Sequence, residues 1–232
     1  MSHALTRAGQ NLTLAEKRLV MLAVSKLTKI NSAGVSPTTR ITAAEYAEEF
    51  GVALDTAYTQ LRSTAKHLYN RTLTFYEPSH RRKRNDEMVY TEVNMRWVGE
   101  AKYHKREGWV ELAWWHRLVP HLVGLRKQFT QYQLTQATAL RSVYSWRLLE
   151  LLSMFEKTGW AQFDIQDFAT AMNATEKQVA NFAKVRTKII EPAVRELTEK
   201  DGWLIEWEPI KAGRKVKSLR FTFRRNPQGS LF

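Results

Sequence analysis

Apolar residues near the start of the chain recur at the three- and four-residue spacing of a helix and define one inner side. Thr13 is followed three residues later by Glu16, a spacing typical of the capping box at a helix N-terminus. The pattern predicts a first helix that runs to about Ile30. The apolar positions on its inner side are Leu12, Ala15, Leu19, Leu22 and Ala23.

Two more helices are predicted after a break that contains Gly, Ser and Pro. The first covers residues 41–51, with Thr42 as its N-cap and Gly51 at its end. The second runs from Ala53 to Arg71, which completes the order of a helix-turn-helix: a short helix, a Gly turn and a longer helix. The inward positions of the longer helix are Ala57, Tyr58, Leu61, Ala65 and Leu68.

The segments after this helix pair have the composition of strands. Residues 72–76 and 88–97 are rich in β-formers and enclose the basic stretch 79–86, which predicts a hairpin with a charged tip. Residues 108–113 indicate a third strand. A basic hairpin that follows a helix-turn-helix is the wing of a winged-helix domain.

The same order of elements then repeats, after a closing helix from Trp114 to Leu125 with a kink expected at Pro120. An amphipathic helix is predicted over Ala137–Phe155, a short helix over residues 163–173 and a long helix over Thr175–Glu199. The repeat is one of architecture, because the residues themselves differ. The apolar stripe of the long helix is Phe182, Val185, Ile189, Ala193 and Leu197.

A second hairpin follows the long helix. Its strands are predicted at residues 203–208 and 218–223, with the basic tip 211–217 between them. The sequence thus predicts an α+β, mainly helical fold of two tandem winged-helix domains, at residues 1–128 and 129–232.

The chain is strongly cationic, with 36 Lys and Arg against 23 Asp and Glu and a formal net charge of +13. Divided after Gln128, the first part holds 20 basic and 12 acidic residues, and the second holds 16 and 11. Cations that neutralise phosphates release counterions, so this charge favours nucleic acid as the partner. Because both parts are cationic, we expect each of them to contact it.

Other chemistry finds little support in the residues. Cysteine is absent, which excludes disulfides and thiolate metal sites and fits a reducing compartment. The chain starts without an apolar signal core, and no segment reaches the roughly 18 apolar residues of a membrane span, so we expect a cytoplasmic protein. His116 and His121 are five residues apart, which matches neither a helical zinc pair nor a nicking-enzyme motif.

No phosphate-binding loop is present in the sequence, and Tyr69, Tyr103 and Tyr144 stand beside no carboxylate–histidine cluster. We therefore expect no catalysis, metal or cofactor. The eight tryptophans raise the alternative of base stacking on single-stranded nucleic acid. Four of them fall on predicted strands that pack under helices, which favours the core, namely Trp97, Trp109, Trp203 and Trp207.

The start of the long helix in the second domain carries the residues expected to read bases. A recognition helix presents its N-terminal part to the major groove, where Arg and Lys pair with guanine and Asn with adenine. Lys177, Asn181, Lys184 and Lys188 follow a spacing that puts them on one helix face beside the apolar stripe. Arg186 falls within that stripe and reaches DNA only if the helix start projects beyond the core. The alternative for all five is a solvated cationic face.

Contacts with the phosphate backbone are expected mainly from the wings, whose flexible tips can follow it. The longer helix of the first domain adds two candidates. The alternative is a charged hairpin that only aids solubility. The expected backbone-contacting residues are Lys211, Arg214, Lys215, Lys217, Arg81, Arg82, Lys83, Arg84, Arg62 and Lys66.

Three segments carry a resemblance that spans about residues 10–225. They are Asn11-Leu-Thr-Leu-Ala-Glu-Lys-Arg-Leu, Leu140-Arg-Ser-Val-Tyr-Ser-Trp-Arg-Leu-Leu-Glu-Leu-Leu, and Ile189-Ile-Glu-Pro-Ala-Val-Arg-Glu-Leu ahead of the hairpin with Gly213-Arg-Lys. In these segments the chain resembles the initiator family of iteron-controlled plasmids, the group that includes the initiator of the F plasmid.

The resemblance implies a protein that binds directly repeated, double-stranded origin sites as a monomer, helps to melt the origin, and recruits the host initiator and the replicative helicase. It also implies a homodimer, in equilibrium with the monomer, that represses the initiator's own gene. In such proteins the second domain reads bases, while the first contacts the backbone or dimerises. The competing interpretations are a winged-helix transcriptional repressor without melting activity, and a DNA-nicking replication enzyme.

Overall fold

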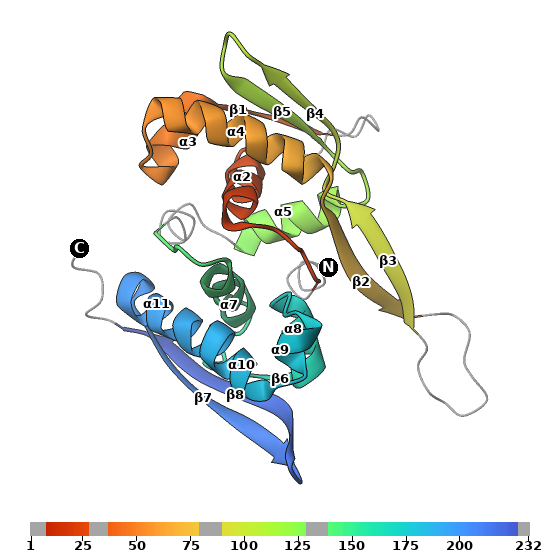
Figure 1. Ribbon diagram of the computed structural model, residues 1–232, viewed down its shortest axis with the longest axis vertical. Helices are drawn as coiled ribbons and strands as arrows, with labels where there is room; N and C mark the ends of the chain where they lie inside the picture. The colour runs from red at the N-terminus through yellow and green to blue at the C-terminus, as the bar shows by residue number, and fades with distance from the viewer. Residues whose placement is uncertain (1–7, 28–36, 79–89, 129–138, 227–232) are drawn as a thin grey trace.

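The computed structural model describes residues 8–27, 37–78, 90–128 and 139–226. Figure 1 shows two lobes, each of which combines helices with antiparallel strands. The elements of the first lobe precede residue 129, and those of the second follow residue 138. Buried apolar side chains from both lobes form one contiguous cluster, so the lobes pack directly against each other.

The first lobe places three helices ahead of most of its strands. Strands β1, β5 and β4 form one antiparallel sheet in that order, and β2 pairs with β3 in a separate hairpin. In chain order its elements are α2 (Leu14–Ser25), β1 (Thr38–Thr42), α3 (Ala43–Phe50), α4 (Leu54–Tyr69), β2 (Thr72–Pro78), β3 (Tyr90–Arg96), β4 (Val98–His104), β5 (Trp109–Trp114) and α5 (Val119–Gln128).

The helix ends of the first lobe follow the local signals in the sequence. The side chains of Thr13 and Thr42 each accept the N–H of a glutamate three residues on, and each glutamate accepts the threonine N–H in return. Gly51 ends α3 in the left-handed conformation, with φ 61°. Both predicted N-caps and this stop are confirmed. The predicted run of the first helix to about Ile30 is wrong, because α2 ends at Ser25.

The predicted closing helix from Trp114 to Leu125 is wrong in its first turn and in its kink. Trp114 is the last residue of β5, and its indole N–H donates to Thr39 Oγ1 at 3.0 Å. Helix α5 begins only at Val119, which places Pro120 in the first turn. A proline there removes no helical hydrogen bond, because the first N–H groups of a helix have no partner within it.

The second lobe repeats this architecture without the separate hairpin. Strands β6, β8 and β7 form one antiparallel sheet in that order, which corresponds strand by strand to β1, β5 and β4. The predicted assignment of the first wing to β2 and β3 is therefore wrong, because the equivalent of the hairpin β7–β8 is β4–β5 and β2–β3 is an additional hairpin. In chain order its elements are α7 (Val143–Ser153), β6 (Trp160–Asp164), α8 (Ile165–Ala171), α9 (Glu176–Val179), α10 (Phe182–Val185), the π-helical turn η1 (Arg186–Ile190), α11 (Glu191–Asp201), β7 (Trp203–Ala212) and β8 (Lys215–Arg225).

Two helices of the second lobe are shorter than predicted. The helix expected over Ala137–Phe155 begins at Val143, because the side chain of Ser142 caps it by accepting the N–H two residues on. Phe163, expected at the start of a helix, lies instead in β6, and Asp164 then caps α8.

Strands β1, β4 and β6 were not predicted. The first and last of these have five residues each, too few for alternation to be distinctive.

The tryptophans largely occupy the core, as the sequence predicts. Trp97 and Trp203 are completely buried, and Trp109 and Trp207 are partly buried. Trp160 on β6 and Trp115 are the exceptions, with 47% and 37% of their surfaces exposed. The sequence therefore placed the four strand tryptophans correctly, and the alternative of a stacking platform gains nothing from them.

Candidate nucleic-acid interface

The segment expected to form one long helix from Thr175 to Glu199 is interrupted near its start. Helix α9 ends at Val179, Asn181 has an extended backbone with φ −136° and ψ 100°, and a new helix begins on its C-terminal side. Lys177 therefore belongs to a different helix from the other candidate base readers. The single polar face predicted from their spacing does not continue across this break.

Asn181 serves as the N-cap of α10. Its side-chain Oδ1 accepts the N–H of Ala183 at 3.0 Å, and its main-chain carbonyl accepts the N–H of Lys184 at 2.8 Å. A bidentate contact with adenine uses both the oxygen and the nitrogen of the amide. The cap therefore competes with the adenine contact that the sequence predicts for this residue.

Lys184, Arg186 and Lys188 lie together on the C-terminal side of this cap, on α10 and η1, and all three are exposed. The guanidinium of Arg186 forms an ion pair with Glu191, with 3.3 Å between Nε and Oε1. Arg186 was predicted to fall within the apolar stripe, but it does not lie there, because Val185 takes the buried position beside it. These three cations form the compact part of the predicted base-reading set.

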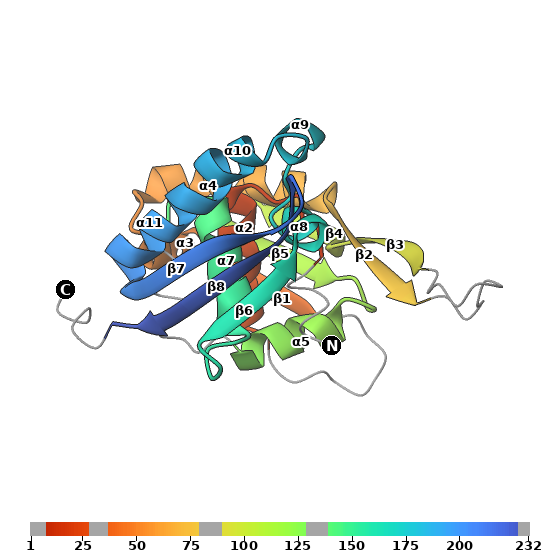
Figure 2. The same cartoon turned by 90° about the horizontal axis from the view of Figure 1, so that it is seen from below.

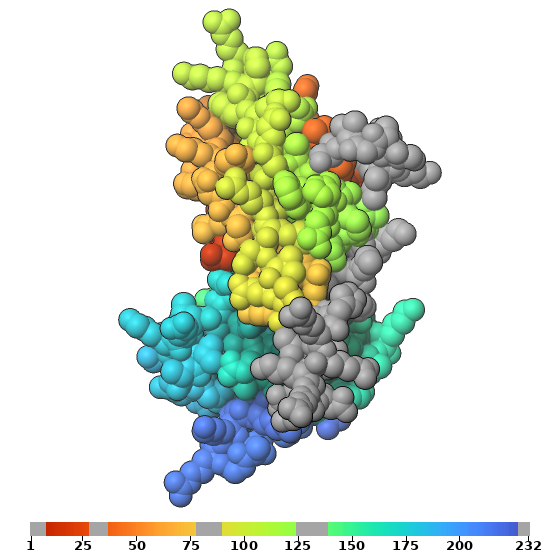
Figure 3. All heavy atoms as spheres, turned by 90° about the vertical axis from the view of Figure 1, so that its right-hand side faces the viewer, coloured from red at the N-terminus to blue at the C-terminus, as the bar shows by residue number. Residues whose placement is uncertain are grey.

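The second wing is longer than predicted. Strands β7 and β8 remain paired up to Ala212↔Lys215, and Gly213 (φ 62°) with Arg214 makes the turn. Lys211, Arg214, Lys215 and Lys217 are all exposed around this turn. Figure 3 shows the tip of the hairpin (blue) projecting beyond the rest of the second lobe. An exposed, projecting cationic hairpin has the shape required to follow a phosphate backbone.

In the first lobe, Arg62 and Lys66 lie on the exposed side of α4. The guanidinium carbon of Arg62 lies 5.4 Å from the ring centroid of Tyr103, close enough for a cation–π contact that orients the arginine. The four cations predicted at the tip of the first wing, residues 81–84, lie outside the described residues.

The candidate helices of the two lobes lie on the same side of the molecule. Figure 2 shows α4 of the first lobe and α9 and α10 of the second near the upper edge of the view. Helix-turn-helix proteins contact DNA by such helices and commonly engage neighbouring parts of one duplex with two of them. The arrangement places cations from both lobes where one duplex can contact them.

A buried cluster of charges joins the lobes between α2 and α7. Lys17 Nζ lies 2.5 Å from Glu150 Oε1, and Arg147 Nη1 lies 2.9 Å from Glu150 Oε2. These three side chains are at most 4% exposed. Lys17 also donates to Gln10 Oε1, and Arg147 donates to the carbonyl of Ala8, both at 2.9 Å. The cluster is tied to the main chain of both lobes, because Arg147 also donates to a carbonyl at the end of α8.

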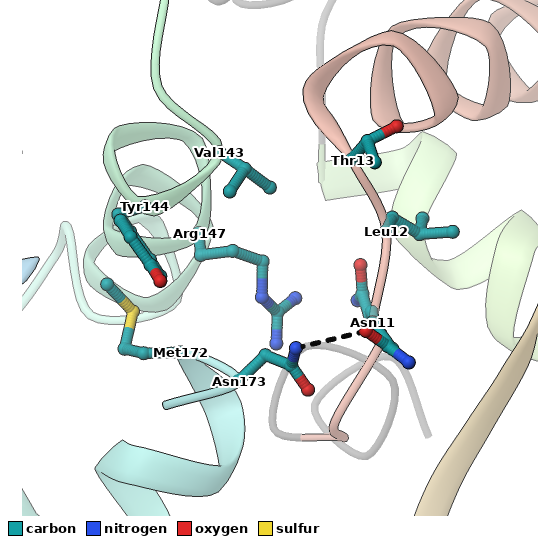
Figure 4. Close-up of a pocket in the computed structure, with 9 residues that line it drawn as sticks. Asn11, Leu12, Thr13, Val143, Tyr144, Arg147, Met172 and Asn173 are labelled. Atoms are coloured by element: carbon teal, nitrogen blue, oxygen red, sulfur yellow. Dashed lines mark hydrogen bonds between the residues drawn. The ribbon is translucent and has the colours of Figure 1, made fainter. Parts of the chain in front are cut away.

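Beside this cluster the junction contains a cleft of about 260 Å³. Figure 4 shows Arg147 extending from α7 toward the segment that precedes α2. Across the cleft Asn173 Nδ2 donates to Asn11 Oδ1 at 3.3 Å, and both asparagines have a positive φ, 52° and 45°. The junction is therefore polar as well as buried.

Burial lowers the pKa of Lys17 from 10.5 to about 8, against the opposing attraction of Glu150. The charge of Arg147 lowers the pKa of Lys17 further, and burial lowers the pKa of Arg147 itself. Two buried cations thus share one carboxylate. The free energy lost by removing such charges from water can equal or exceed the free energy that their attraction contributes. A buried cluster of this kind is weak evidence of added stability, because well-packed apolar residues in its place are often neutral or stabilising. These three residues were given no role from the sequence alone, although all of them fall within the segments that carry the family resemblance.

Two negative findings concern the part of the chain that the structure describes. None of its helices is both long and apolar enough to cross a membrane. Over the same ranges, no three His, Asp or Glu side chains come together in a group that would hold a metal ion.

Comparisons with solved structures support the architecture. The chain is similar to the Pi initiator protein, solved in complex with iteron DNA, with a TM-score of 0.69 and 18% identity over 97% of this chain and 94% of that one. It is also similar to domains 2 and 3 of RctB, with a TM-score of 0.51 and 11% identity over 92% of this chain and 81% of that one. These likenesses establish the fold, two tandem winged-helix domains.

Comparisons of sequence identify the family. A curated Escherichia coli protein, described as an uncharacterised 27.6 kDa protein, is 24% identical over 229 residues, which cover 94% of this chain and 92% of that protein. The family model described as initiator replication protein, WH1, matches residues 1–153, and the one described as initiator Rep protein, WH2, matches residues 164–223. The resemblance found in the sequence is thereby confirmed, and the chain belongs to the initiator replication protein family.

Proposed function

We propose that this initiator binds directly repeated iteron sites in double-stranded plasmid origin DNA, and that it does so as a monomer. The observation that carries the proposal is that α4 and α10 lie on one side of the molecule, and that these helices and the adjoining η1 carry exposed cations. The iteron DNA bound to the Pi initiator, which has a similar fold, supports the same class of ligand. The net charge of +13 supplies the attraction to phosphates.

The two domains divide the work unequally. The second domain, residues 129–232, reads bases through the cations of α10 and η1, and its wing contacts the backbone. The first domain, residues 1–128, clamps the backbone through α4 and the hairpin β2–β3. Of the five residues predicted to read bases, Lys184, Arg186 and Lys188 lie on these elements of the second domain. Lys177 lies on α9, and Asn181 joins the set only when its side chain leaves the cap of α10.

The initiator also acts through partners. A dimeric form binds an inverted repeat and represses the initiator's own gene, and the origin-bound form opens the duplex and recruits the host initiator and the helicase. The chain itself makes and breaks no bond in DNA, and it works in the bacterial cytoplasm. Membership of the initiator family supports these steps.

Selection of binding sites from a library of random duplexes tests the base-reading assignment. The wild-type chain should enrich one motif. Lys184→Ala with Lys188→Ala should abolish discrimination between that motif and scrambled DNA, because two groove contacts are lost. The control, Lys157→Ala with Arg224→Ala, removes the same charge from exposed positions on the α7–β6 connection and near the C-terminal end of β8. Equal discrimination by both double variants would refute the assignment.

Two further measurements separate the competing functions. Incubation with Mg²⁺ or Mn²⁺ and a supercoiled plasmid that carries the selected motif in tandem should leave the plasmid intact. Nicked circles with covalently attached protein would make the chain a nicking enzyme. Sedimentation should show monomers on direct repeats and dimers on inverted repeats; one oligomeric state on both would contradict the proposed division between initiation and repression.

A further inference from the structure

The recognition segment of the second domain has an apolar stripe with an unusual period. Val185, Ile189, Ala193 and Leu197 are each buried to 1% exposure or less, and they recur at every fourth residue. An α-helix turns by about 100° per residue, so a strict four-residue period drifts by about 40° at each step. Over three steps an unbroken α-helix would rotate one end of this stripe about 120° away from the core.

The π-helical turn η1 absorbs this drift. The N–H of Glu191 donates to the carbonyl of Arg186, five residues back, where an α-helix would use the fourth. The next residue is Pro192, which has no N–H to donate and whose ring disfavours an α-helical approach to the carbonyl of Lys188. The proline and the four-residue period therefore favour the same extra residue in the turn.

The extra residue decides which side chain faces outward. Counted back from Ala193 along an unbroken α-helix, Arg186 lies seven residues, or about two turns, away and would point into the core. In the structure Val185 takes the buried position, and the side chain of Arg186 is 52% exposed. The π-turn thus moves this arginine from the core side to the solvent side.

The ion pair between Arg186 and Glu191 follows from the same turn. Residues five apart lie about 140° from each other around an α-helix, too far for their side chains to meet. A turn closed by a five-residue hydrogen bond brings them to nearly the same side, and here Nε and Oε1 lie 3.3 Å apart. Glu191 consequently restricts the direction in which the guanidinium extends.

We infer that Glu191 and Pro192 are positioning residues that hold Arg186 in place to read a guanine in the major groove. The inference rests on the proposed function and deepens it by selecting Arg186 from the five candidates. A guanidinium binds guanine O6 and N7 with two parallel hydrogen bonds, which demand a defined orientation. Lys184 and Lys188 are point charges on flexible stems and depend less on the turn.

Substitution of Glu191 tests the inference, because it removes the charge that faces Arg186 across the turn. Glu191→Gln keeps the turn and weakens the ion pair, so we expect an unchanged midpoint of urea unfolding, with a several-fold loss of discrimination between selected and scrambled duplexes. The control, Glu199→Gln, removes the same charge from an exposed position on α11; it should keep wild-type discrimination.

A change in the DNA identifies the atom that is read. Each guanine of the selected motif is replaced in turn by 7-deazaguanine, which lacks the N7 acceptor. At one position the wild type should lose affinity several-fold, while Arg186→Ala should be indifferent to the replacement and Glu191→Gln should lose less than the wild type. A purely structural role of Glu191 would not reduce the loss at one base.

Pro192→Ala is the second test, because it removes the ring that disfavours an α-helical approach to the carbonyl of Lys188 and restores an N–H that can donate to it. We expect a folded protein whose discrimination is several-fold lower than that of the wild type. Full discrimination by a folded Glu191→Gln would overturn the inference, and full discrimination by Pro192→Ala would remove Pro192 from it. If the wild type itself enriched no motif, the proposed function would fail instead, so the two failures are distinguishable.

Discussion

The helices that correspond to each other in the two domains differ in regularity. Helix α4 of the first domain is one unbroken α-helix of 16 residues, whose buried positions include Ala57, Leu61, Ala65 and Leu68. The equivalent segment of the second domain consists of two short helices, a π-turn and a final helix. A regular helix suffices where cations only approach phosphates, whereas the interrupted one places particular side chains at particular angles. Under the proposed division of work, one fold serves as a clamp in the first domain and as a reader in the second.

The hairpins of the two domains differ as well. The hairpin β7–β8 belongs to the sheet β6-β8-β7, and its topological equivalent in the first domain is β4–β5 in the sheet β1-β5-β4. The hairpin β2–β3, predicted as the first wing, is an additional two-stranded element between α4 and β4, and its Tyr76 and Tyr90 are 55% and 57% exposed. A hairpin without a third strand is held less firmly by its own domain. Among its described residues the second domain has no counterpart of this hairpin, because β7 follows α11 directly.

The largest expected effect tests whether the two domains act as one body. Glu150→Gln leaves Lys17 and Arg147 as buried cations without their carboxylate, and we expect a loss of about 3–5 kcal/mol in the free energy of unfolding. Urea denaturation measures it. The control, Glu199→Gln on the exposed side of α11, should stay within about 0.5 kcal/mol of the wild type. Equal effects would mean that the junction contributes no coupling between the domains.

A smaller effect tests the first domain alone. Gly108 has φ 62°, and a Cβ added there would lie 1.9 Å from Cε1 of Tyr58 on α4. Gly108→Ala should therefore destabilise the protein by about 2 kcal/mol, through backbone strain and displacement of that ring. Gly51→Ala is the matched control, since Gly51 has φ 61° and open space around it; it should show only the strain, about 1 kcal/mol, in thermal unfolding.

The pH dependence tests the charge that the first domain contributes to the junction. The pKa of Lys17 is about 8 in the folded protein against an ordinary 10.5, so between these values the unfolded chain binds more protons than the folded one. The free energy of unfolding should consequently rise with pH in this window, by at most about 1.4 kcal/mol per pH unit. Lys17→Met should lack this rise in urea titrations at pH 8, 9 and 10. A parallel pH dependence in both proteins would contradict the buried, protonated state of Lys17.

The smallest effect separates the wing of the second domain from its helix. Lys215→Ala should weaken binding of the selected and scrambled duplexes equally, by a few-fold, because a phosphate contact carries no sequence information. The slope of log affinity against log salt should flatten by about one. Fluorescence anisotropy across a salt series measures both. If this substitution alone erased sequence preference, the division between helix and wing would be wrong.

Local chemistry was largely predictable from the sequence. Neighbouring residues specify the N-caps at Thr13 and Thr42, the helix end at Gly51 and the basic hairpin around Gly213. The structure contains all of these features. The sequence also contains a signal of the π-turn, namely apolar residues at every fourth position followed by Pro192. A search that assumes the α-helical period of 3.6 residues misses this signal.

What the sequence did not disclose depends on residues that are distant along the chain. Lys17 and Glu150 are ordinary charged residues within two apolar helices, and nothing local indicates that they meet. The one hint is that residues 19–24 are uniformly apolar, which is typical of a helix buried on every side. Periodicity shows which face of a helix is buried but does not identify what covers it.

The hydrogen bond from Arg147 to the carbonyl of Ala8 spans 139 residues, and it bears on how the protein is made. Domains generally fold in order as they leave the ribosome, so the first domain emerges while α7 has yet to be synthesised. Lys17 then lacks its partner Glu150, and Ala8 lacks its contact with Arg147, although Gly9 can already pair with Thr74 of β2. The nascent chain can close this junction only after α7 has left the ribosome, so the alignment of the two domains waits for the second one to be made.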